Sequence, residues 1–140
     1  MYTLKVGSGF DSAHFLKGYE GKCSNIHGHH WSVEVIVGSD TLSDDKQTRG
    51  MIVDFSDLKK DLRELTDNLD HSLIIEKGSL KEKTLEALKE ENFRIVELDI
   101  RPTAENLSRY FYELMSKKGY KVIEATVYET RKNCASYRED

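Results

Sequence analysis

The sequence predicts one α+β domain in which helices pack on one face of an antiparallel sheet. Three observations predict this class. Some stretches alternate apolar and polar residues, as strands do, and others have apolar residues at helical spacing. The predicted strands and helices are also grouped along the chain and do not follow one another in strict alternation. The 140 residues contain one proline and no internal repeat, so the range 1–140 is predicted to fold as a single domain. A core of this size is stable without metal or disulfides, and any metal site is therefore expected to be functional.

The composition excludes several classes of partner. The chain has 21 Lys+Arg against 25 Asp+Glu, a net charge of −4, and no basic block of the kind that binds nucleic acid. No apolar run approaches the roughly 20 residues of a membrane span, and the first residues lack the pattern of a signal peptide. Cys23 and Cys134 are too few for a disulfide scaffold. We expect a soluble cytoplasmic protein with reduced thiols that binds neither nucleic acid nor membranes.

Two strands are predicted first along the chain. Apolar side chains alternate with polar ones over Tyr2–Val6 and over Trp31–Val37, as in strands with one buried face. The Gly- and polar-rich segment Gly18–His30 between them is predicted to be a loop, and Asp40–Gly50 a second polar connection.

The first helix is predicted to begin at a cap formed by Ser56, with Asp57 near the positive end of the helix dipole. Its leucines recur at helical spacing and form one apolar face. They are Leu58, Leu62, Leu65 and Leu69.

Two more helices and two more strands complete the expected fold. Ser79 and Glu82 have the spacing of a capping box before the second helix, and Gly119 is predicted to end the third. The predicted ranges are a helix at 80–91, a strand at 96–100, a helix at 103–119 and a strand at 120–131, with Ile123, Ala125 and Val127 on one face of the last strand.

The strongest chemical signal is a group of histidines, because four of the five lie between His14 and His30. In an extended segment His27 and His29 point to the same side, and Gly28 leaves room between them. If the first strand continues far enough, His14 supplies a third nitrogen from the paired strand. Three neutral imidazoles with an open fourth position are typical of catalytic zinc. The alternative is a polar turn with exposed histidines, and His30 is predicted to be a bystander.

Cys23 precedes His27 by four residues, and two roles are open to it. It could close the zinc shell as a fourth ligand, which would make the site structural. Alternatively the thiol lies beside the metal, where the positive charge favours the thiolate and lets it act as a base. The spacing alone does not separate these roles.

Acidic residues supply further candidates. Asp70 could orient the imidazole of His71, although adjacent side chains usually diverge at a helix end. Glu129 stands on the face of the last predicted strand where an apolar residue is expected, so its carboxylate needs a partner. Thr103 followed by Glu105 has the pattern of an ordinary helix cap with an acid in the first turn, and we favour that interpretation.

Taken together, these residues resemble the family of 6-pyruvoyl-tetrahydropterin and 6-carboxy-tetrahydropterin synthases. The matching motifs occur in the family's order and span nearly the whole chain, so the set is specific although each motif is short. They are Phe10-x-x-Ala13-His14, Cys23-x-x-x-His27-Gly28-His29, Val53-Asp54-Phe55-x-x-Leu58, Leu69-Asp70-His71, Pro102-Thr103-x-Glu105-Asn106 and Glu129-Thr130.

The resemblance implies a tunnelling fold, in which subunits join antiparallel sheets into a trimeric barrel and two trimers commonly stack into a hexamer. It implies that three of the histidines bind zinc, that Cys23 is the catalytic thiol, and that Asp70 with His71 transfers protons. The zinc ligands would be His14, His27 and His29.

The resemblance also implies how the substrate is held. Glu129 would anchor the amino-pyrimidine edge of a pterin by charge-assisted hydrogen bonds, which supplies the partner that its carboxylate needs. Glu105 with Thr103 would assist from a neighbouring subunit.

The substrate implied by the resemblance is 7,8-dihydroneopterin triphosphate, whose side-chain hydroxyls would bind the zinc. Retro-aldol cleavage with loss of acetaldehyde and triphosphate gives 6-carboxy-tetrahydropterin, the queuosine and deazapurine precursor. Elimination with internal redox gives 6-pyruvoyl-tetrahydropterin. The short Cys-to-His spacing and the tail Cys134-x-x-Tyr137-Arg138 favour the carboxy-forming branch.

The segment Ser72–Arg101 departs from compact family members, because it carries an additional helix and strand. A rival from a different class is a non-catalytic zinc module. In that rival Cys23 and the three histidines close the metal shell and leave no position for a substrate.

Overall fold

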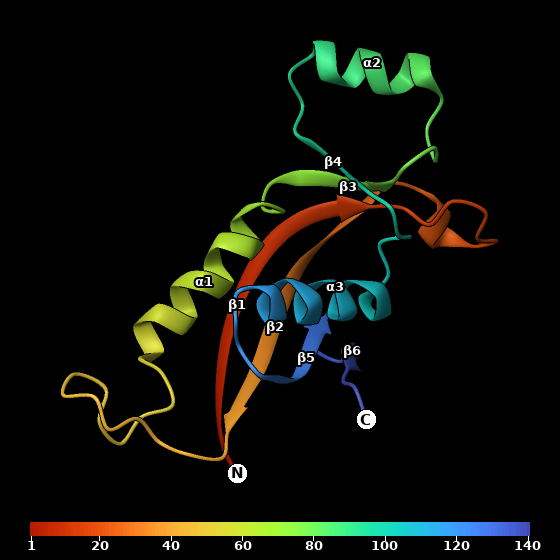
Figure 1. Cartoon of the computed structure of the whole chain (residues 1–140). Helices are drawn as coiled ribbons and strands as arrows, with labels where there is room; N and C mark the ends of the chain where they lie inside the picture. Colours follow the sequence, from red (N-terminus) through yellow and green to blue (C-terminus); the bar gives the residue numbers. More distant parts are fainter.

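The computed structural model describes residues 1–140 and contains six strands and three α-helices (Figure 1). A 3-10 turn at Lys22–Ser24 lies in the connection between the first two strands. None of the helices combines the length and the apolar character needed to cross a membrane. In chain order the elements are β1 (Tyr2–His14), β2 (His27–Ser39), α1 (Phe55–Asp67), β3 (Ser72–Glu76), α2 (Glu82–Glu90), β4 (Ile95–Leu98), α3 (Ala104–Lys117), β5 (Val122–Tyr128) and β6 (Cys134–Tyr137).

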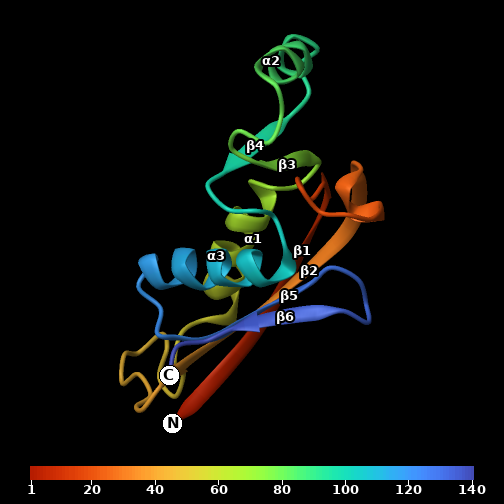
Figure 2. The same ribbon diagram turned by 90° about the vertical axis from the view of Figure 1, so that its right-hand side faces the viewer.

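All six strands form one curved sheet in the order β4-β3-β1-β2-β5-β6 (Figure 1, Figure 2). The pairs β1–β2, β2–β5 and β5–β6 are antiparallel, which agrees with the antiparallel sheet that was predicted. The pairs β1–β3 and β3–β4 are parallel, so the sheet is mixed. The chain between β3 and β4 crosses over through α2, and a crossover of this kind makes neighbouring strands parallel.

The core lies between the sheet and two of the helices. α1 buries Leu58 and Leu62 against the sheet, and α3 buries Leu107 and Phe111 on the same face. The helix α2 buries no residue and stands apart from the sheet (Figure 1, Figure 2). Packing of helices on one face is therefore confirmed for α1 and α3, while α2 projects from the edge that β3 and β4 form.

The strands β1 and β2 are longer than the stretches of alternating apolar and polar residues from which they were predicted. They pair in unbroken register from Tyr2 opposite Ser39 to His14 opposite His27. The predicted loop Gly18–His30 is therefore wrong for its last four residues, which belong to β2. Pairing with β1 overrides the polar composition of this stretch, because strand formation depends more on cross-strand neighbours than on intrinsic preference.

Helix capping differs from the prediction in two of three cases. Asp54, and not Ser56, caps α1, since its carboxylate accepts a hydrogen bond of 2.7 Å from the Ser56 amide. Ser79 does not cap α2, which begins later at Glu82 without a side-chain cap. The third case is confirmed, because the Thr103 hydroxyl caps α3.

The end of the chain holds two strands where one was predicted. A register shift beside Val37 turns Val122 into the core, so Ile123 is only half-buried although Ala125 and Val127 are buried as predicted. The chain then turns back and forms β6, which adds the outer edge of the sheet.

Candidate functional site

The three predicted metal-binding histidines lie together at one end of the β1–β2 pair. His14 is directly opposite His27, and His29 is the next residue on the same face of β2. Ring centroids are 4.5 Å apart for His14 and His27, 5.1 Å for His14 and His29, and 5.0 Å for His27 and His29. Trp31, fully buried, packs edge-on against His14 and His29 and closes the group toward the core.

Backbone carbonyl groups orient two of the imidazoles. Nδ1 of His14 lies 2.8 Å from the Pro102 carbonyl oxygen, and Nδ1 of His27 lies 2.7 Å from that of Asn25. A carbonyl oxygen only accepts hydrogen bonds, so each Nδ1 carries the proton and each Nε2 keeps its lone pair. This is the second contact that histidine ligands of zinc ordinarily make. Sequence reasoning missed Pro102 and Asn25, because a backbone acceptor leaves no side-chain signal.

The Nε2 atoms of His14, His27 and His29 are buried and have no hydrogen-bond partner. Three such atoms in one group would be costly unless another group satisfies them. A zinc ion accepts three neutral imidazole nitrogens and keeps an open position for water or substrate. The residues present therefore fit the metal that the sequence predicts.

Glu129 joins the three histidines in the structure. Its Oε1 lies 2.8 Å from His29 Nε2 and 3.8 Å from His14 Nε2. One ligand atom from each of the four residues lies within 4.8 Å of all the others. The carboxylate that needed a partner thus finds one within its own chain, and its contact with a pterin stays a prediction.

Burial sets the charge of the histidine group. It lowers the pKa of His14 and that of His29 below the ordinary value, because the imidazolium loses its hydration, and the neighbouring imidazole of His27 disfavours a further positive charge on either ring. The hydrogen bond with the Pro102 carbonyl group opposes this trend at His14, and Glu129 opposes it at both histidines, without reversing it. At pH 7 the imidazoles of His14 and His29 are therefore neutral, which is the form that binds metal.

Cys23 lies outside the group of four residues that could hold a metal ion, His14, His27, His29 and Glu129. It sits half-buried on the 3-10 turn, where its carbonyl oxygen accepts a 2.8 Å hydrogen bond from the Leu16 amide, two residues beyond His14. This bond holds the turn near the end of β1. The structure therefore favours a thiol beside the metal site over a fourth metal ligand.

Asp70 and His71 do interact, and they form a second cluster together with Asp11. His71 Nδ1 is 2.8 Å from Asp70 Oδ2, while Asp70 Oδ1 accepts a 2.8 Å hydrogen bond from the Asp11 amide. The His71 amide donates to the Asp11 carbonyl oxygen at 2.7 Å. The sequence did not predict that Asp11 belongs to this cluster, because its contacts depend on β1 lying beside the turn that follows α1.

The electrostatics of this second cluster are opposite to those of the first. The hydrogen bond and negative charge of Asp70 raise the pKa of His71, and the hydrogen bond from the Asp11 amide lowers the pKa of Asp70. The pair therefore favours imidazolium beside carboxylate. His30 also contacts this cluster, with its Nδ1 2.8 Å from Asp11 Oδ1, and is outside the metal group as predicted.

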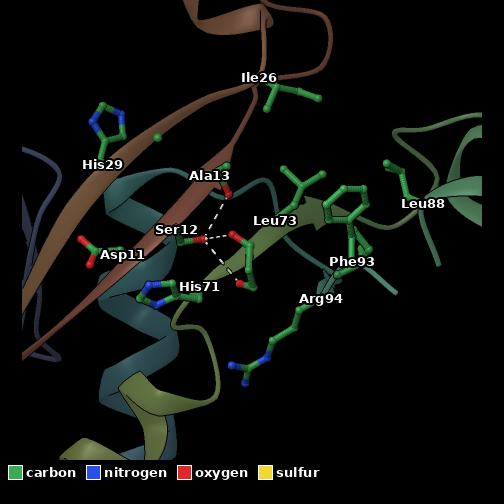
Figure 3. A pocket seen from close by; sticks show the side chains of 13 residues that line it. Asp11, Ser12, Ala13, Ile26, His29, His71, Leu73, Leu88, Phe93 and Arg94 are labelled. Atoms are coloured by element: carbon green, nitrogen blue, oxygen red, sulfur yellow. Dashed lines mark hydrogen bonds between the residues drawn. The ribbon is translucent and has the colours of Figure 1, made fainter. Parts of the chain in front are cut away.

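A cavity of about 690 Å³ adjoins both clusters, since His29 and His71 are among its lining residues (Figure 3). Its far wall is apolar and includes Leu73, Leu88 and Phe93. Leu88 and Phe93 belong to the segment between β3 and β4, so this segment helps to shape the cavity.

Thr103 and Glu105 are not brought to the cavity. The Thr103 hydroxyl accepts a 3.2 Å hydrogen bond from the Asn106 amide, which is the capping role that the sequence favours. Glu105 is exposed in the first turn of α3.

The model of the family described as 6-pyruvoyl tetrahydropterin synthase matches residues 3–140. The chain belongs to this family. Relatives include 6-carboxy-5,6,7,8-tetrahydropterin synthases from Aquifex aeolicus, 34% identical over 129 residues (85% of this chain, 77% of the relative), and from Haemophilus influenzae, 29% identical over 142 residues (99% and 100%). This synthase family is a family of enzymes.

Solved structures show the same fold. An uncharacterized protein from Wolinella succinogenes superimposes with a TM-score of 0.78 at 20% identity, over 99% of this chain and 98% of its own. The 6-pyruvoyl tetrahydropterin synthase of Caenorhabditis elegans gives 0.68 at 24% identity, over 99% and 96%. The predicted tunnelling fold of this synthase family is thereby confirmed.

The predicted metal site can be tested with two neighbouring histidines, His29 and His30, whose side chains lie on opposite faces of β2. His29→Ala removes one of the three orphan Nε2 atoms, so the purified variant should lose most of its zinc and keep its folded core. His30→Ala, on the opposite face of β2, should retain zinc as the unaltered protein does. Elemental analysis of both proteins measures this. Full zinc occupancy in His29→Ala would remove His29 from the ligand set.

The second cluster makes a prediction about pH. Because Asp70 favours the imidazolium, His71 should titrate above the ordinary histidine value of about 6.5, staying protonated as the pH rises past that value and losing its proton only at the raised pKa. Asp70→Asn should bring the midpoint back toward about 6.5. NMR of the ring protons measures both. A midpoint for His71 that does not change in Asp70→Asn would contradict the pairing.

Proposed function

We propose that this protein is a zinc-dependent 6-carboxy-5,6,7,8-tetrahydropterin synthase. It acts on 7,8-dihydroneopterin triphosphate and releases acetaldehyde and triphosphate. The observation that carries the proposal is the convergence of three buried Nε2 atoms without hydrogen-bond partners, beside a cavity that His29 and His71 help to line. The names of the relatives support the carboxy-forming reaction over the pyruvoyl-forming one.

The proposed metal ligands are His14, His27 and His29. Zinc bound there would supply Lewis-acid activation of the substrate's side-chain oxygens. The Nδ1 contacts with backbone carbonyl groups fix the direction of His14 and His27 before any metal arrives. This preorganisation avoids the loss of side-chain freedom on binding.

Two groups are proposed to move protons. Cys23 Sγ takes a proton from the substrate side chain, from its position on the 3-10 turn outside the ligand group. His71 returns protons at Nε2, since its Nδ1 is engaged by Asp70 Oδ2. The carboxylate of Asp70 holds the imidazole in this tautomer and favours its protonated form.

Glu129 is proposed to anchor the pterin ring. A carboxylate that faces ring N–H groups makes charge-assisted hydrogen bonds, and its place beside the histidines would hold the substrate side chain against the metal. Glu105 is exposed on α3 and can reach a neighbouring subunit, while Thr103 contributes by fixing the start of that helix.

A homo-oligomer, trimer or hexamer, is proposed because the curved sheet is open at both ends. β4 and β6 are its edge strands, and unpaired edges favour pairing with another chain. Such an enzyme would work in the cytoplasm and supply the precursor of queuosine and other deazapurines.

Product analysis tests the proposal directly. The zinc-loaded protein is incubated with 7,8-dihydroneopterin triphosphate, and pterins and aldehyde are separated and quantified. We expect 6-carboxy-tetrahydropterin and acetaldehyde in equal amounts. Formation of 6-pyruvoyl-tetrahydropterin without acetaldehyde would establish the alternative synthase activity, whereas a zinc-loaded protein that leaves the substrate intact would be a non-catalytic zinc module.

The two cysteines provide a matched pair for testing the thiol. Cys23→Ala should retain zinc, because Cys23 is outside the ligand group, but turnover should fall by about 10²- to 10⁴-fold, the usual contribution of a general base. Cys134→Ala, exposed on β6, should keep both zinc and turnover. Loss of zinc from Cys23→Ala would instead show that the thiol is a metal ligand.

A further inference from the structure

The side chain of Arg94, which lies just before β4, contacts the turn that carries His71. Its guanidinium donates hydrogen bonds to three backbone carbonyl oxygens: 3.0 Å to Asp67, 2.9 Å to Asn68 and 2.6 Å to Asp70. All three belong to the last residue of α1 and the turn after it. A single side chain from the segment between β3 and β4 therefore binds the chain immediately before His71.

These contacts suit an arginine in particular. Carbonyl groups at the C-terminal end of a helix have no partner within the helix, and the helix dipole favours a positive charge there. The planar guanidinium carries several N–H donors in a fixed arrangement, so it can join three carbonyl oxygens at once. The compact ammonium group of a lysine does not span the same set.

Arg94 also holds the chain on the other side of His71. Its own carbonyl oxygen accepts a 3.0 Å hydrogen bond from the Leu73 amide, at the start of β3. The residues bound by Arg94 thus bracket His71 at both ends. Figure 3 shows the Arg94 side chain extending from the cavity wall on the side where His71 lies.

His71 needs such support because burial does not hold it. Its backbone adopts a φ of 52°, in the left-handed region that a residue with a side chain rarely occupies. Its side chain is 77% exposed, so no surrounding packing fixes the imidazole. Its orientation depends on the backbone of the turn and on the hydrogen bond with Asp70.

We propose that Arg94 is a positioning residue, which keeps the His71 turn in the conformation that presents the imidazole to the cavity. This inference rests on the proposed function in one respect, the proton-transferring role of His71. Arg94 acts through the turn and not on the substrate, so the segment between β3 and β4 is coupled to the chemistry of the site.

The test compares Arg94→Met with Arg109→Met. Arg109 is also exposed, but it binds Glu113 on α3, away from the turn. Arg94→Met should keep its zinc and its KM within about twofold, and its kcat should fall by about 10- to 100-fold, as expected when a catalytic group is displaced by about 1 Å. Exchange of the His71 amide proton, measured by NMR, should accelerate at least about tenfold, because the turn opens more often. Arg109→Met should match the unaltered protein in zinc content, KM, kcat and the exchange rate of the His71 amide proton.

A His71→Ala background shows whether Arg94 acts through His71. If it does, adding Arg94→Met to His71→Ala should lower kcat by less than about twofold further, since the group being positioned is gone. An equal loss in both backgrounds would overturn the proposal and indicate general damage to the fold. Unchanged amide exchange in Arg94→Met, or faster exchange with unchanged kcat, would overturn it as well.

Failure of the proposed function gives a different result. A zinc-loaded unaltered protein without turnover would reject the synthase activity, whereas the amide exchange of His71 in Arg94→Met would still report whether Arg94 holds the turn. The structural part of the inference is therefore decided independently of the substrate.

Discussion

The register between β1 and β2 is the constraint on which the proposed metal site of His14, His27 and His29 depends. His14 faces His27 across the pair, and the same register sets Phe10 beside Trp31 in the core. A shift of one residue would turn His27 and His29 to the opposite face and bring His30 to the inner one. The same shift would expose the apolar side chains of β2, so the packing of the core and the geometry of the metal group are held by one set of contacts.

A second part of the fold completes this geometry. The Pro102 carbonyl oxygen that orients His14 stands just before α3, and the Thr103 cap fixes where that helix begins. α3 is in turn held against the sheet by buried side chains, among them Phe111 beside Phe10. A helix that contributes no proposed metal ligand therefore determines which nitrogen of His14 is free to bind one.

The contacts among the histidines of the β1–β2 pair could be predicted from the sequence. Contacts that depend on pairing between strands far apart in the sequence could not. His27 and His29 share a face because strands alternate, and His14 joins them once the first strand is long enough. The contact of Glu129 with His29 depends on β5 lying beside β2, and the contact of Asp11 with Asp70 depends on β3 lying beside β1. Neither pairing follows from local periodicity. The order of family motifs indicated that Glu129 and Asp70 belong to the same site as the histidines, but it gave no role to Asp11.

The capping errors have the same origin. Asp54 and Ser56 are both good capping residues, and the backbone decides between them, because Asp54 is extended while Ser56 already lies inside α1. Arg94 gave no signal at all, because its partners are backbone carbonyl groups of a turn that is more than twenty residues away in the sequence. Contacts of side chains with distant backbone groups are the part of such a site that only a three-dimensional structure supplies.

The central claim is that the three Nε2 atoms form the metal site and that Cys23 stands outside it. Zinc-edge X-ray absorption on the zinc-loaded, substrate-free protein, combined with the anomalous signal of zinc in a crystal, tests this most directly. We expect one zinc ion at His14, His27 and His29, with zinc–nitrogen distances of about 2.0 to 2.1 Å and no sulfur neighbour. A zinc–sulfur distance near about 2.3 Å, or a metal ion at Asp11, Asp70 and His71 instead, would contradict the account.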